Sequence, residues 1–391
     1  MEIFVNTNYD FIKWRFAGVI FSLCIILAGV IGYFTLGLNV GIDFSGGANI
    51  VLRFQQAPPI AELRQLMTDA TIQQYGKTAD NSVLIRLPEI AEETDYAGQA
   101  VRRLNEAINA GNAGKLDLNY QGAGSISEVL AAADPDNLGT GTAAKEHYLT
   151  VARAVIAHRS SVGIFHSIDE VKASEGLSPA AADALTKSAV LGRFNLLNQE
   201  TVGPQVGKDL QKKAALAIIL SVLAMGIYIA FRFDFKFGIA AIICLAHDVF
   251  VSLSFLILIG GEFSLVTVAA FLMIVGYSVN DTVVVYDRVR ENAKKARAKE
   301  SFADLMNRSM NQTLSRTVLT GGCVMMILVC LGVFGGEVIK DFAWLLLVGS
   351  ICGTYSTVTV VPAIVLAWNK YIAKKAGLYG GGAEVATTAR G

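Results

Sequence analysis

Long runs of apolar residues with few or no charges dominate the hydrophobic pattern of this chain. Each run can cross a hydrocarbon core of about 30 Å as an α-helix, which rises about 1.5 Å per residue. The pattern therefore predicts an α-helical membrane protein with six transmembrane helices. The runs cover residues 16–39, 214–231, 237–259, 263–285, 317–336 and 342–368.

The segment between the first two runs, about residues 40–211, instead alternates short strand and helix patterns. In chain order these are strand 47–54, helix 59–70, strands 71–75 and 82–87, helix 94–110 and strand 194–203. The order β-α-β-β-α-β predicts a ferredoxin-like α+β domain, the split βαβ arrangement. Residues from about 111 to 192 are rich in Ala and Gly and contain helical patches such as 147–159, so we expect a helical insertion in that domain.

Lys and Arg residues near the ends of the apolar runs predict the orientation in the membrane, because such residues are enriched on the cytoplasmic side. They gather before the first run, between the second and third, between the fourth and fifth, and after the sixth. Both termini are therefore expected in the cytoplasm. The predicted divisions are 1–39 (N-terminus and first helix), 40–211 (extracytoplasmic domain), 212–369 (helices two to six) and 370–391 (cytoplasmic tail).

Composition adds three constraints. Hydrophobic residues make up 53% of the 391 residues, which favours an integral membrane protein over a large soluble domain. Lys and Arg number 33, as do Asp and Glu, so net charge indicates no nucleic-acid partner. All five cysteines fall in apolar runs, so no disulfide framework is expected in the extracytoplasmic domain.

The first run is too long for the apolar core of a signal peptide and predicts an uncleaved anchor.

Asp281 is the one charge in the run 263–285. A carboxylate at the centre of a membrane helix costs about 2.5 kcal/mol or more, and such residues usually face a bundle interior or a watery cavity. Tyr277 and Ser278 lie one helical turn before it, and Asn280 and Thr282 flank it. A helix cap or a purely structural carboxylate would also fit, but we expect Asp281 to handle protons.

A second polar group lies in the run 237–259, where His247 and Asp248 are adjacent near the middle. Arg316, at the start of the fifth run, is expected at a similar depth to Asp281. A cation there favours the charged carboxylate, whereas desolvation favours the neutral acid, and a group balanced in this way can switch. The alternative is a static ion pair that locks two helices. For His247, hydrogen-bonded packing and a proton relay remain equally open.

Other chemistry finds little support in the sequence. No Walker A motif is present, since Gly207-Lys208-Asp209 lacks the upstream glycine and the Ser or Thr. The four histidines have no metal-ligand spacing with cysteine, so no metal site is expected. The small-residue stripe 349–357 is explained by close helix packing. We therefore predict a protein without enzymatic activity or cofactor, in which protons are the coupling ion.

Five segments together resemble the SecF family, the smaller subunit of the SecD–SecF accessory complex of bacterial protein export. They are GIDFSGG (41–47), VGPQVGKDL (202–210), AHDV (246–249), VGYSVNDTVVVYDRVREN (275–292) and SRTVLTG (315–321). Any one motif is weak, but the ordered set spans both ends of the outer domain and the membrane helices at the spacing of the family.

The resemblance implies half of an RND-like transporter in the bacterial inner membrane, with a SecD-like subunit, the SecYEG channel and a translocating preprotein as partners. It implies that Asp281 is the proton-responsive aspartate, that Arg316 is the arginine beside it, and that Asp248 has a less settled role. The insertion at about 111–192 exceeds the short connection usual in the family.

Two rival functions remain at this point. One is half of an RND-type exporter of lipids or small molecules, although such exporters normally carry two halves and two outer domains in a single chain. The other is a scaffold in which the intramembrane charges are only structural.

Overall fold

The computed structural model describes residues 7–88, 95–112, 114–295 and 300–375. The chain divides into two compact units. Residues 1–44 and 209–391 form one, here called the membrane unit, and residues 45–208 form the other, the outer unit. Each unit has its own apolar core.

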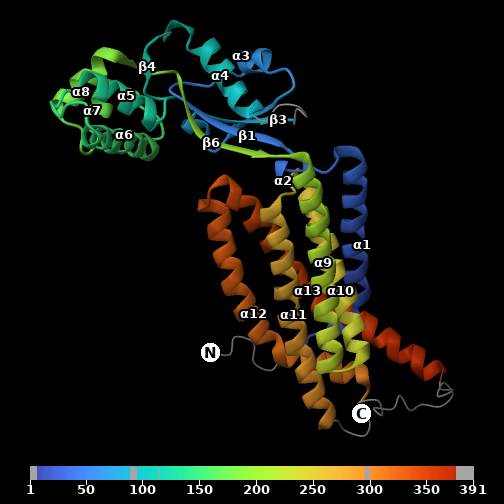
Figure 1. Cartoon of the computed structure of the whole chain (residues 1–391). Coiled ribbons are helices and arrows are strands. Elements are labelled where there is room, and N and C mark those ends of the chain that lie inside the picture. The colour runs from blue at the N-terminus through green and yellow to red at the C-terminus, as the bar shows by residue number, and fades with distance from the viewer. Residues whose placement is uncertain (1–6, 89–94, 113, 296–299, 376–391) are drawn as a thin grey trace. The chain divides into compact units, whose positions relative to one another are not determined.

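The membrane unit is built from long apolar helices, drawn in Figure 1. Six of the described helices are long and apolar enough to span a bilayer, as the sequence predicts. They are α1 (Phe11–Leu36), α9 (Pro204–Arg232), α10 (Phe235–Leu258), α11 (Leu265–Lys294), α12 (Phe302–Phe334) and α13 (Glu337–Lys375). Several of these helices extend beyond the apolar runs. Helix α9, for example, includes the polar stretch that follows Pro204 and so begins ten residues before residue 214.

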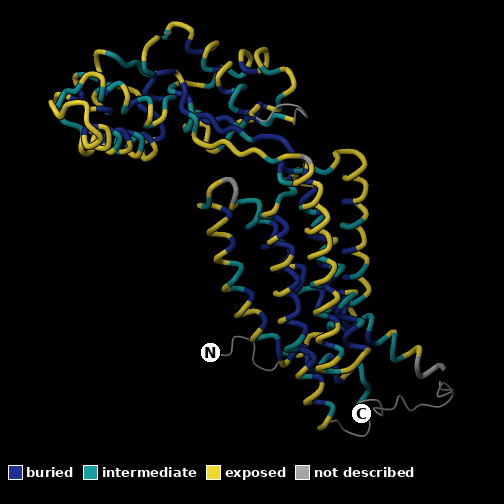
Figure 2. Tube along the Cα trace, in the orientation of Figure 1, coloured by how far each residue is buried: buried dark blue, intermediate teal, exposed yellow. Residues whose placement is uncertain are grey.

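Three of these helices form the centre of the membrane unit. About half of the apolar stretch is buried in α10 (50%), α11 (56%) and α13 (56%), against 17–22% in α1, α9 and α12. Figure 2 shows this contrast as dark blue inner helices beside yellow outer ones. A polar side chain on an inner face of α10, α11 or α13 is therefore removed from both water and lipid.

Hydrogen bonds at the two ends of the membrane unit show which connecting segments lie together. At one end, Phe263 pairs with the segment after α1, donating to Asn39 O (2.7 Å) and accepting from Gly41 N (2.9 Å). At the other end, the segment before α1 contacts α12: Tyr9 N donates to Asn311 Oδ1 (2.8 Å) and Phe11 N to Asn307 Oδ1 (2.9 Å).

The outer unit contains an antiparallel sheet of four strands in the order β2-β3-β1-β6. The elements are β1 (Gly47–Phe54), α3 (Ile60–Leu66), β2 (Thr71–Tyr75), β3 (Ser82–Leu87), α4 (Tyr96–Ile108) and β6 (Phe194–Val202). Alternate residues of β1, namely Ala48, Ile50, Leu52 and Phe54, enter the core with Leu63 of α3 and Leu104 of α4. Element order and strand order are both those of the ferredoxin-like fold, which confirms that prediction.

Four helices and two short strands follow α4 as the predicted helical insertion. They are β4 (Leu116–Asp117), α5 (Ala123–Ala133), α6 (Thr142–Val162), α7 (Ile168–Lys172), α8 (Pro179–Ser188) and β5 (Ala189–Val190). Tyr148 and Phe165, both fully buried, belong to an apolar core distinct from that of the sheet. The insertion is therefore a subdomain with a core of its own.

Hydrogen bonds from Asn119 hold this subdomain together and fix the strand that returns to the sheet. Its side chain donates to Phe165 O and Gly192 O (both 2.9 Å) and accepts from Phe165 N (2.9 Å), and Asn119 is fully buried. Nearby, Asp117 accepts from Gly192 N (2.8 Å) and from Asn119 N (2.9 Å). Burial raises the pKa of Asp117, although these bonds and the charge of Arg159 act in the opposite direction.

We expect Asn119→Ala to lower the stability of the outer unit by about 2–3 kcal/mol, because it leaves buried backbone groups unpaired. The measurement is amide hydrogen exchange at Phe165 and Gly192 in the full chain. The matched control is Asn198→Ala, at an exposed position on β6, where the side chain donates to Glu200. Equal exchange in the two variants would contradict the role assigned to Asn119.

Candidate functional site

Asp281 lies on α11, is only 2% exposed and faces α13. Thr354 of α13 donates its hydroxyl to Asp281 Oδ2 at 3.0 Å. Thr282, one residue after Asp281, and Thr357, three residues after Thr354, form a second hydroxyl contact of 3.1 Å between the same two helices. The carboxyl group is thus held by a neutral donor within the apolar centre of the membrane unit.

Arg316 does not form an ion pair with Asp281 in the part of the chain that the structure describes. It lies near the middle of α12, and its side chain is exposed. Among the residues expected to support Asp281, Tyr277 places its hydroxyl against Gly321 of α12, and Asn280 is exposed on α11. Arg288 lies apart from the site and binds Glu291 and Gln312.

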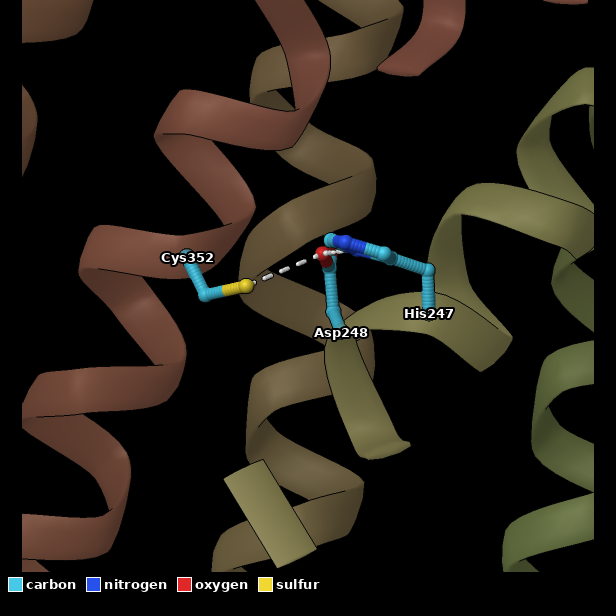
Figure 3. Close-up of side chains that lie close together, drawn as sticks. All are labelled: His247, Asp248 and Cys352. Atoms are coloured by element: carbon cyan, nitrogen blue, oxygen red, sulfur yellow. Dashed lines mark hydrogen bonds and ion pairs between the residues drawn. The ribbon is translucent and has the colours of Figure 1, made fainter. Parts of the chain in front are cut away.

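Asp248 of α10 is the more elaborate centre, and it is completely buried. Its Oδ2 accepts hydrogen bonds from Ser278 Oγ (2.6 Å) and Ser356 Oγ (3.0 Å). Its Oδ1 faces His247 Nδ1 at 2.9 Å and Cys352 Sγ at 3.5 Å (Figure 3). Ser278, expected on sequence grounds beside Asp281, therefore serves Asp248 instead, because successive turns of α11 face different partners.

Glycines on α13 make this convergence of three helices possible. A Cβ atom on Gly353 would lie 2.9 Å from the Cβ of Ser278, and one on Gly349 would lie 2.3 Å from Ile274 Cδ1. A side chain at Gly353 would meet the Cβ and the backbone Cα of Ser278, so the two helices would have to separate. The close approach brings α13 hydroxyls within hydrogen-bond distance of both aspartates.

The small-residue stripe of α13 is therefore more than the packing surface that its sequence indicates. Besides its glycines it carries Cys352, Thr354 and Ser356, which donate to Asp248 or Asp281. Sequence reasoning missed these three donors. The available signal was their helical spacing from Gly349 and Gly353, which puts hydroxyl and thiol groups beside the positions where the neighbouring helix comes closest.

The geometry suits a group that changes protonation state. A hydroxyl can donate to a carboxylate and can also accept from a carboxylic acid, so Thr354, Ser278 and Ser356 can satisfy either form. His247, Asp248 and Cys352 additionally place three potential metal-ligand atoms within 4.8 Å of one another.

Comparison with known proteins identifies the class of protein that this fold and site represent. Residues 182–371 match the family model described as protein export membrane protein SecD/SecF, C-terminal, and residues 34–58 match the SecD/SecF GG motif. The crystal structure of SecDF from Thermus thermophilus aligns with a TM-score of 0.63 and 28% identity. That alignment covers 93% of this chain and 39% of the SecDF chain, so this chain spans about two fifths of that longer protein.

The relatives in sequence are more specific. The protein translocase subunit SecF of Koribacter versatilis is 39% identical over 390 residues, which cover 95% of this chain and 94% of the relative. The protein translocase subunit SecDF of Thermus thermophilus is 47% identical over 177 residues, covering 45% of this chain and 24% of that protein. The chain belongs to the SecF family.

The bonds to Asp248 Oδ2 generate a stability prediction. Ser278→Ala should lower the free energy of unfolding by about 1–3 kcal/mol, because it leaves a fully buried carboxyl oxygen with one hydrogen-bond donor fewer. Thermal unfolding of the full chain in detergent measures this. Ser221→Ala on α9 is the matched control, since Ser221 bonds to Ile218 O of its own helix. An equal decrease in the free energy of unfolding in the two variants would show that the bond from Ser278 to Asp248 adds no particular stability.

Proposed function

We propose that this SecF-family subunit assists Sec protein export by passing protons through its membrane unit, with Asp281 as the residue that takes up and releases the proton. The observation that carries the proposal is a carboxyl group buried among apolar helices and bonded to a neutral hydroxyl rather than to a cation. Such a group can lose or gain a proton without losing its hydrogen bond. Because it has no enzymatic step in this scheme, the subunit draws its work from the proton gradient.

Arg316 takes the role of a conditional partner in this scheme. Its guanidinium is exposed and forms no ion pair with Asp281 in the part of the chain that the structure describes. A shift of α12 toward α11 would bring the cation closer and favour release of the proton. Each charge that crosses the membrane potential supplies about 2.3 kcal/mol per 100 mV. Asp248, which accepts from two hydroxyls and lies beside His247, would be a second protonatable group.

The exposed polar groups of the membrane unit support a SecD-like partner. Arg316 near the middle of α12 and Asn280 near the middle of α11 both point away from the core of this chain. Lipid cannot satisfy such groups, so a second membrane subunit or enclosed water must cover them. We further propose that the SecD-like subunit supplies this cover, and that the SecYEG channel and the translocating preprotein are the remaining partners.

We also propose that the chain lies in the bacterial inner membrane with both termini in the cytoplasm. Support comes from the Lys and Arg residues, such as Lys13 and Arg15, near the end of the membrane unit where the segment before α1 contacts α12. Labelling of single introduced cysteines from each side of the membrane would test the orientation.

Asp281→Asn should fold and insert normally, because an amide can still accept from Thr354, but it cannot titrate. We expect export of a secreted reporter with a proton gradient to fall to its level without one. Asp287→Asn, an exposed position on the same helix, is the matched control and should export normally. Unchanged gradient dependence in Asp281→Asn would remove this residue from the mechanism and favour a structural scaffold.

Arg316→Met should stall the same cycle, because an unpaired charge on Asp281 is disfavoured in a medium of low dielectric constant. Arg316→Lys should restore part of the gradient-dependent export, since it returns the charge without the planar fork of arginine. Both variants are to be measured beside the wild type at matched protein levels. Full activity in Arg316→Met would exclude Arg316 from proton release.

Reconstitution of the purified chain without SecD should give no proton-coupled activity, because the polar face around Arg316 then lacks its cover. Addition of a SecD-like subunit to the same vesicles should produce activity. Robust proton coupling by the isolated chain would contradict the two-subunit arrangement.

A further inference from the structure

Two hydrogen-bond donors converge on a single oxygen of Asp248. His247 Nδ1 lies 2.9 Å from Oδ1, and Cys352 Sγ lies 3.5 Å from the same atom. The hydroxyls of Ser278 and Ser356 occupy the other oxygen. Figure 3 shows the imidazole and the thiol approaching the carboxyl group from two different helices, α10 and α13. The proton-transfer scheme for Asp281 uses neither the thiol nor the imidazole.

We propose that His247, Asp248 and Cys352 form a binding site for a divalent transition-metal ion of the Zn²⁺ type. One nitrogen, one oxygen and one sulfur ligand are the donor types that Zn²⁺ takes in proteins, at bond lengths of about 2.0–2.3 Å. A tetrahedral ion with such bonds separates its ligand atoms by roughly 3.3–3.7 Å. The sulfur–oxygen distance of 3.5 Å already has this value, and the nitrogen–oxygen distance of 2.9 Å must open by roughly half an ångström. All three ligand atoms lie within 4.8 Å of one another, so the nitrogen and the sulfur are also close enough to approach one ion.

The charges of this ligand set match a divalent ion in an apolar setting. A thiolate and a carboxylate together cancel the two positive charges of the ion, and the imidazole adds none. The complex is therefore neutral, which avoids the cost of an uncompensated charge in the membrane interior.

Binding of the ion displaces protons from the ligands. The Cys352 thiol releases its proton to water, and the imidazole proton moves from Nδ1 to Nε2 so that Nδ1 can bind the ion. If Asp248 is protonated, it releases a second proton. No electron is transferred and no further reactant is required.

The surroundings of the carboxyl group favour this geometry over one in which both oxygens bind the ion. The two serine hydroxyls fix Oδ2 and leave Oδ1 directed at the other two ligands. Hydrogen bonds of this kind orient metal ligands and commonly change metal affinity 10–100-fold. An ion bound here would join α10 to α13 and occupy Asp248, so it would slow any cycle in which these helices move or Asp248 titrates.

The test is Co²⁺ titration of the full-length chain purified in detergent, followed by optical absorption. Coordination by Cys352 should produce a thiolate-to-cobalt charge-transfer band, and Zn²⁺ should abolish it by displacement. Only a thiolate ligand gives this band, so Co²⁺ bound to the three histidines of the segment 40–211, which contains no cysteine, would not produce it. The readout does not depend on export, so its failure would leave the role of Asp281 untouched.

Matched variants decide which thiolate binds. Cys352→Ser should lose the band, whereas Cys330→Ser, at an exposed position on α12, and Cys244→Ser should keep it. Ser356→Ala should keep the band and weaken Co²⁺ binding by about 10–100-fold, as expected for loss of a hydroxyl that orients the carboxyl ligand.

Absence of the band from the wild-type chain would overturn the proposal, as would its persistence in Cys352→Ser. Size-exclusion chromatography establishes that each variant is folded. If Cys352→Ser is not, His247→Gln takes its place: a Co²⁺ affinity equal to that of the wild type would overturn the proposal, and a loss of tenfold or more would support it.

Discussion

The membrane unit depends on the close contact between α13 and α11 at Gly349 and Gly353. Because these positions lack side chains, the two backbones approach far enough for α13 hydroxyls to reach carboxyl groups on α10 and α11. Without that approach Asp248 and Asp281 would be buried with unsatisfied oxygens, which the apolar interior does not tolerate. Packing and polar satisfaction are thus a single constraint in this protein, and both are met by one helix face.

Neutral donors give the two buried aspartates a property that a salt bridge would remove. An arginine bonded directly to Asp281 would stabilise the charged form and hold it there. Hydroxyl groups accept either protonation state, so the position of a more distant cation can select between them. Under the proposed function Arg316 would be that cation, and its side chain is exposed on α12.

In the outer unit, too, apolar packing and the pairing of buried polar groups occur together. The helical insertion has its own apolar core, yet it is joined to the returning strand through the buried amide of Asn119. A long insertion is tolerated because it leaves the four-stranded order β2-β3-β1-β6 intact. The ferredoxin-like sheet domain and the inserted subdomain therefore have separate apolar cores, and substitutions in one core need not disturb the other.

The helices and strands of this protein follow from its local sequence. Apolar run length defines the membrane helices and alternation defines the strands, since both report local burial, and Asp281 and Asp248 are visible because a charge in such a run is costly. The hydrogen-bond partners of the two aspartates depend on helix packing, because Thr354, Ser356 and Cys352 are more than 70 residues from Asp281 and Asp248 in the chain. The same limit explains why the sequence did not reveal that Ser278 bonds to Asp248 on another helix. Periodicity indicates which face of a helix is polar. The packing of the whole bundle determines which helix lies opposite that face.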